Sequence, residues 1–91
     1  MTDVVFLPGD DWEGRRHAVL FRAQTDDEDL VVCLVPSETL RERFAALSAD
    51  KGSCLEAFQV NRPRLEEIAR RLIQKERFED DGSIVIRTVD A

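Results

Sequence analysis

The sequence predicts an α+β fold, built as a single domain over residues 1–91 around a mainly antiparallel sheet. Three strand-like segments come first, two helical segments follow, and one strand-like segment returns, which gives the order β-β-β-α-α-β. Chains that group strands and helices into separate blocks form α+β folds. The length of 91 residues, with 43% hydrophobic and 35% charged side chains, is typical of one globular domain.

The first three strands are predicted from apolar segments that end at turn residues. The segment "DVVFLPGD" (3–10) closes at Pro8-Gly9, and "RRHAVLFRAQ" (15–24) alternates in polarity. The polar turn "TDDED" (25–29) joins it to "LVVCLVP" (30–36), so we expect a hairpin. Pro36 ends the third strand because proline has no N–H to donate to a neighbouring strand.

The first helix is predicted over residues 38–48. Ser37 is a residue type preferred at a helix N-cap, and the acidic Glu38 suits the first turn. Leu40, Phe44 and Leu47 recur at helical spacing and form one apolar stripe. Gly52 in "ADKG" can take the left-handed conformation that ends helices.

The second helix is predicted to begin at Ser53 and to be kinked or broken. Ser53 and Glu56 have the spacing of a capping box. Pro63 removes a hydrogen bond from a continuous helix, whereas Asn61 could cap a restarted segment with Pro63 in its first turn. After Pro63 the helix carries one apolar face, which we expect to pack on one face of the sheet. The last strand is predicted at "SIVIRTV" (83–89). The residues of the apolar helix face are Leu65, Ile68, Ala69, Leu72 and Ile73.

The strands are apolar on both sides, which predicts an interaction face. Two helical segments can cover one side of the sheet, whereas an antiparallel sheet with one solvated face should alternate apolar with polar residues. The second side could curl towards a barrel, lie under the N-terminal loop with Trp12, or meet another subunit. Its predicted members are the apolar Ala18, Leu20, Val32, Leu34 and Val85 and the arginines Arg16, Arg22 and Arg87.

The two cysteines have different predicted environments. Cys33 lies among valine and leucine residues, so we expect it in the core, where burial raises a thiol pKa. Cys54 follows Ser53, and at a first helical position the helix dipole would favour a thiolate. Cys54 is therefore the candidate reactive thiol, with an ordinary half-exposed thiol as the alternative.

No catalytic residue, metal site or cofactor is predicted. The sequence contains none of the glycine-rich nucleotide-binding, hydrolase or zinc-protease motifs, and its acidic clusters lack the spacing of a calcium loop. One histidine and two cysteines make a four-ligand zinc site improbable. We therefore do not expect an enzyme. The face arginines could hold a small anion, or could be the rim of an interface.

Charge and hydropathy restrict the partners and the location. The net charge of −6 opposes binding to a phosphate backbone, so we expect no nucleic-acid partner. The N-terminus lacks the basic and apolar regions of a signal peptide, and no segment approaches the length of a membrane span. We expect no membrane partner and a cytoplasmic location with reduced thiols.

Taken in order, these segments resemble a known family. "VVFLPGDDWEGRRHAVLFRA", "LVVCLVPSETLRERF", "LEAFQVNRPRLEEIARRLI" and "DGSIVIRTVD" are similar to the domain of unknown function 1488 family, small and mostly proteobacterial proteins. Pro63 departs from the more continuous helix of that pattern. The resemblance implies an α+β fold and a bacterial cytoplasmic setting, and no activity. The residues that carry the resemblance are Phe6, Trp12, Phe21, Cys33, Leu40, Phe44, Phe58, Asn61, Arg62, Ile68, Ala69 and Asp90.

Two functional hypotheses follow. The first is a non-catalytic interaction module that binds a second copy or a protein partner through the second sheet face or the helix pair. The alternative is a redox-sensitive thiol or small-anion-binding protein that uses Cys54 and the face arginines.

Overall fold

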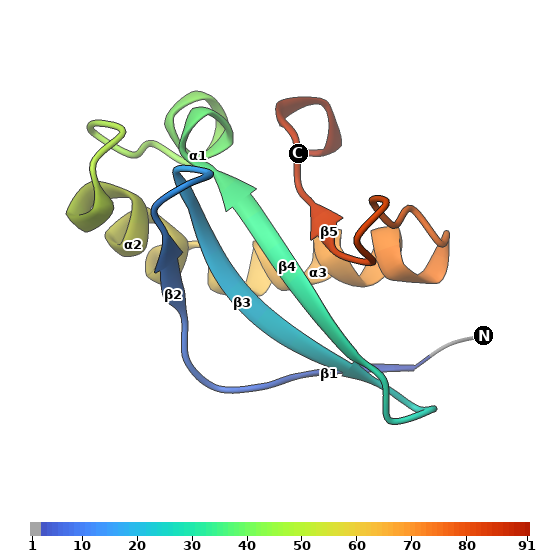
Figure 1. The fold of residues 1–91 in the computed structure, drawn as a ribbon. Coiled ribbons are helices and arrows are strands. Elements are labelled where there is room, and N and C mark those ends of the chain that lie inside the picture. The colour runs from blue at the N-terminus through green and yellow to red at the C-terminus, as the bar shows by residue number, and fades with distance from the viewer. Residues whose placement is uncertain (1–2) are drawn as a thin grey trace.

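A computed structural model describes residues 3–91 of the chain (Figure 1). Four strands precede three α-helices, and a short strand and a 3-10 turn end the chain. The elements are β1 (Val4–Phe6), β2 (Asp11–Glu13), β3 (Ala18–Thr25), β4 (Leu30–Pro36), α1 (Ser37–Arg43), α2 (Lys51–Val60), α3 (Arg62–Gln74), β5 (Ile84–Val85) and η1 (Thr88–Asp90). The α+β class is confirmed.

The sheet is open and mostly antiparallel, as predicted. Its strands are ordered β1-β3-β4-β5, and β2 also pairs with β3. Among the strands of residues 3–91, only the β4–β5 pair is parallel, with Leu34 opposite Val85. The sequence did not predict β2, because its three residues Asp11–Glu13 are mostly charged and show no apolar alternation. His17 lies in the turn after β2 with a φ of 47°, and β3 begins one residue later.

The core lies between the sheet and the helices. Alternate residues of β3, including Val19 and Phe21, have no exposed area and point to the helix side. The rings of Phe21 and Phe58 of α2 lie 5.0 Å apart between centroids. Burying each large apolar side chain contributes about 1.5–3 kcal/mol. The helix side of the sheet is therefore the buried one, as α2 and α3 lie behind it in Figure 1.

Helix α1 is shorter than predicted. It ends at Arg43, and Ala45 follows with a φ of 60°, which turns the chain out of the helix. The amides of Phe44 and Ala46 both donate to the Leu40 carbonyl, so residues next to the helix end supply the hydrogen bonds to this carbonyl. The N-cap is Pro36 rather than Ser37. The predicted place of Leu47 on the apolar stripe is wrong: its side chain is 92% exposed.

The predicted second helix is broken into α2 and α3. Helix α2 begins at Lys51, and its N-cap is Asp50, whose carboxylate accepts from the Ser53 amide at 2.7 Å, so the predicted start at Ser53 is wrong. Pro63 lies in the first turn of α3, where its missing N–H has no cost. Between the helices, the Asn61 amide group donates to the carbonyls of Ala57 and Phe44. The Asn61 side chain therefore links the break between α2 and α3 to the end of α1 through hydrogen bonds.

The C-terminal region is less extended than predicted. Strand β5 has two residues, Ile84 and Val85, and the chain turns into η1 at Thr88. None of the helices within residues 3–91 combines the length and the apolar character that crossing a membrane requires.

Candidate functional site

The side of the sheet that faces away from the helices is the candidate site, and we call it the open face. Strand register arranges its residues in rows across the sheet. Val5 lies opposite Gln24, which lies opposite Leu30. Arg22 lies opposite Val32 in the next row. Leu20, Leu34 and Val85 form a third row, and Ala18 lies in a fourth between Glu13 and Pro36.

The exposed apolar side chains gather at one end of the open face. Val5 is 61% exposed, Leu30 is 66% exposed and Val32 is 37% exposed. Ala18 and Leu34, which we placed on this face from the sequence, are buried, and Leu20 and Val85 are half-buried. The chain therefore covers the end of the face near Ala18 itself and leaves the end near Leu30 uncovered.

The sequence allows three ways in which this face could be covered, and the structure excludes two of them within the described residues. The sheet does not close into a barrel, because β1 and β5 remain at opposite ends of the strand order. Trp12 does not lie over the open face. It pairs with Val19 and packs against the core on the α2 side.

A groove of about 250 Å³ runs along the open face. Its floor is apolar and consists of Leu20, Leu30, Val32 and Leu34, and Arg16 and Asp81 are among the polar residues of its walls. Asp81 belongs to the loop before β5, and Arg16 belongs to the turn before β3. The groove thus joins the exposed patch to a polar wall formed by segments far apart in the sequence.

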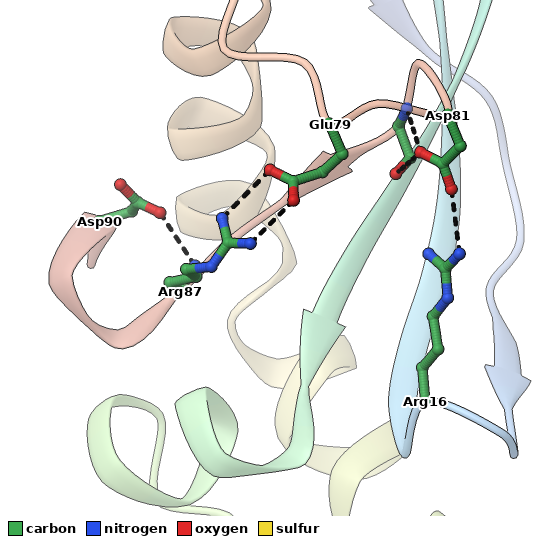
Figure 2. Close-up of polar contacts among 6 residues, drawn as sticks. Arg16, Glu79, Asp81, Arg87 and Asp90 are labelled. Atoms are coloured by element: carbon green, nitrogen blue, oxygen red, sulfur yellow. Dashed lines mark hydrogen bonds and ion pairs between the residues drawn. The ribbon is translucent and has the colours of Figure 1, made fainter.

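An ion pair between Arg16 and Asp81 fixes this wall (Figure 2). The Arg16 guanidinium lies 2.9 Å from the Asp81 carboxylate, which also accepts from the hydroxyl and the amide of Ser83. These hydrogen bonds, those of Ser83 foremost, hold the pKa of Asp81 well below its usual range. Asp81 therefore remains ionised through moderately acidic conditions.

The three predicted arginines do not converge on an anion site. Each guanidinium binds a different carboxylate of the chain: Arg16 pairs with Asp81, Arg22 with Asp11, and Arg87 with Glu79. Figure 2 shows two of these pairs as separate contacts. Arg87 makes two bonds to Glu79, at 2.8 and 3.2 Å, and this lowers the pKa of Glu79. Each of the three arginines is therefore paired with a carboxylate of its own chain.

Both thiols are buried. Cys33 has no exposed area, as expected for a core residue, and burial raises its pKa to about 12. Cys54 is the fourth residue of α2 and also has no exposed area. Burial, and then the Asp50 carboxylate, raise the pKa of Cys54, although Arg41 opposes them. The reason for expecting a helix-stabilised thiolate at Cys54 therefore does not hold.

An acidic turn adjoins the exposed end of the open face. Residues Asp26, Asp27, Glu28 and Asp29 connect β3 to β4 and are all exposed. Within residues 3–91 none of these four carboxylates takes part in an ion pair. We call this segment the acidic tip. In Figure 1 it is the end of the β3–β4 hairpin, remote from α1 and α2.

The sequence reasoning missed three residues of this surface. Val5 is the middle residue of β1, whose sides the sequence analysis did not assign, and Leu30 is the first residue of β4. Asp81 belongs to one of the acidic clusters, which the sequence analysis excluded as calcium loops without placing them on this surface. The available signal was the short "DDGS" segment before the last strand, in which an aspartate two residues before Ser83 can bond its amide and hydroxyl.

Comparison with known proteins identifies the family. A family model described as a protein of unknown function (DUF1488) matches residues 4–86. A crystal structure of a protein of unknown function from the DUF1488 family of Shewanella loihica PV-4 is similar to this chain, with 26% sequence identity and a TM-score of 0.81. The match covers 90% of this chain and 89% of that one. No curated protein matches the sequence. This chain belongs to the DUF1488 family, as its sequence segments indicated.

Proposed function

We propose that this protein is a non-catalytic interaction module of the cytoplasm that binds another protein chain through the open face. The observation that carries the proposal is the exposure of Leu30 and Val32 on β4, and of Val5 across Gln24 in the row of Leu30, on the side of the sheet that lies away from α2 and α3. Clustered exposed apolar side chains with a polar rim are typical of protein interaction sites.

The energetics support a binding role for this surface. Burying side chains of this size stabilises a complex by about 1.5–3 kcal/mol each when they start fully exposed. The rim pairs Arg16–Asp81 and Arg22–Asp11 each combine one positive and one negative charge, so they add no net charge to the face. A partner can therefore approach the apolar centre without meeting uncompensated charge at these points.

The thiol and anion hypotheses have less support. Cys54 is buried with a raised pKa, which opposes the thiolate that redox chemistry requires. An anion would have to displace a carboxylate from Arg16, Arg22 or Arg87. We therefore propose the interaction role alone.

Native affinity purification from the source bacterium, followed by mass spectrometry, tests this proposal. The wild-type chain is compared with the face variant Leu30→Ser/Val32→Ser and with the control variant Leu47→Ser/Val60→Ser. Leu47 and Val60 are 92% and 75% exposed and lie outside the sheet, so the control removes as many exposed apolar side chains elsewhere. We expect stoichiometric partners, or a second copy, to be lost only with the face variant. Equal recovery with all three proteins would contradict the proposal.

A further inference from the structure

We propose that the open face binds an extended, positively charged segment of a partner protein, which lies along β4 and reaches the acidic tip. This deepens the proposed function and rests on it. Three features carry the inference: an uncovered strand edge, an apolar groove beside it, and uncompensated negative charge at its end.

The edge of β4 is only partly covered. Strand β5 pairs with β4 at Cys33 and Leu34 alone. Within residues 3–91, the three residues Leu30–Val32 have β3 on one side and no strand on the other. Uncovered strand edges accept extended chains as additional strands, and the main-chain hydrogen bonds supply affinity.

At the opposite edge of the sheet, arginine side chains occupy part of the main chain of β1 and of the loop after it, which favours the β4 edge. On β1 and the loop after it, the carbonyl groups of Val4, Leu7 and Gly9 accept hydrogen bonds from arginines of α3. Arg62 donates to Leu7 at 2.7 Å and to Gly9 at 3.0 Å, and Arg70 donates to Val4 at 3.3 Å. An incoming strand would have to displace these charged side chains.

The groove gives a strand on this edge a place for its side chains. Leu30 and Val32 belong both to the uncovered edge and to the groove floor. An extended segment places every second side chain on the same face. Alternate apolar residues of the partner would therefore enter the groove and cover Leu30 and Val32.

The charge of the acidic tip selects the sign of the partner. Four carboxylates that form no ion pair within residues 3–91 directly precede Leu30, the first residue of the uncovered edge. Complementary charge speeds association and excludes partners of like charge. Lysine or arginine residues at the end of the partner segment would meet this tip.

The same charge opposes a second copy of this chain as the occupant at neutral pH. The molecule carries a net charge of −6, and a second copy docked on this end would bring another acidic surface towards the tip. A basic heterologous segment is therefore the favoured occupant.

Three labelled octapeptides serve as probes: one alternates lysine with valine, one alternates serine with valine, and one alternates glutamate with valine. Binding to isotope-labelled protein is followed by NMR amide shifts and by fluorescence anisotropy at low and high salt. We expect the lysine peptide to bind most tightly, to shift the amides of residues 26–32 and 81–83, and to weaken with added salt.

Two charge variants sharpen the test. Asp26→Asn/Asp27→Asn should weaken binding of the lysine peptide about tenfold. The control Glu38→Gln/Glu42→Gln removes two carboxylates from α1 and should leave the affinity unchanged. Equal affinities of the two variants would overturn the inference.

The outcomes separate this inference from the proposed function. If the serine or glutamate peptide binds the open face as tightly as the lysine peptide, the inference is overturned and the interaction role stands. A dimer at neutral pH that buries Leu30 and Val32 would likewise overturn the inference and leave the interaction role standing. If no peptide shifts any amide of the open face, the inference fails, and the affinity purification above decides the interaction role separately.

Discussion

Cys33 shows how burial of one residue links the fold to pH. Its thiol lies on the helix side of β4 with no exposed area, and burial raises its pKa from 9.0 to about 12. Between these values the unfolded chain loses this proton while the folded chain keeps it. The free energy of unfolding should therefore fall as pH rises, by about 1.4 kcal/mol per pH unit from this one group.

Chemical denaturation between about pH 9.5 and 11 measures this slope. We expect the wild-type protein to lose stability more steeply than Cys33→Ala, because the variant lacks the titrating thiol. Cys54 is present in both proteins and cancels in the comparison. Parallel slopes for the two proteins would show that the folded state ionises Cys33 as readily as the unfolded chain does.

At the scale of the element, the end of α3 carries a conformational cost that a substitution can remove. Glu76 has a φ of 56°, its amide donates to Ile73, and the Arg77 amide donates to Leu72. This bonding pattern ends helices and usually has glycine at the left-handed position. Glu76→Gly should stabilise the protein by about 1 kcal/mol, since glycine has no Cβ to crowd the following carbonyl.

Thermal unfolding measures this effect, and Lys75→Gly is the matched control. Lys75 has a φ of −90°, so glycine there gains no relief and only adds freedom to the unfolded chain. We expect the melting temperature to rise by about 4–8 °C for Glu76→Gly and not for Lys75→Gly. A decrease for Glu76→Gly would refute the cost assigned to Glu76.

The helices and strands differ in how well local sequence signals predicted where they begin and end. Alternation and turn residues predicted β3 and β4, and Pro63 with Asn61 predicted the site of the helix break, because these signals are local. The start of α2 was wrong because Asp50 and Ser53 are both good caps, and only the observed bond from the Ser53 amide to Asp50 distinguishes them. Leu47 fits the helical stripe, yet the turn at Ala45 removes it from the helix.

At the scale of the whole molecule, the candidate site could be predicted only in part. Strand alternation correctly assigned Leu20, Val32 and Val85 to the side away from the helices. It could not show that Leu34 is buried, because the groove wall comes from Arg16 and Asp81, which are 65 residues apart. Such non-local contacts depend on the strand order, and local patterns do not encode it.

We expect net charge and the open face together to govern whether two copies of the chain associate. At neutral pH the charge of −6 keeps copies apart, and near pH 4.7, the isoelectric point of the sequence, this repulsion disappears. Asp81 and Glu79 have lowered pKa values, so their ion pairs persist at that pH. We expect the exposed apolar end of the open face to contact the same end of a second copy under these conditions.

Sedimentation velocity at pH 7 and near pH 4.7 tests this expectation. We expect the wild-type protein and Leu47→Ser/Val60→Ser to associate only at the lower pH, because both retain the open face. Leu30→Ser/Val32→Ser should remain monomeric at both, since serine removes the apolar area that drives the contact. Association of all three proteins alike would mean that loss of charge alone, rather than the open face, brings the copies together.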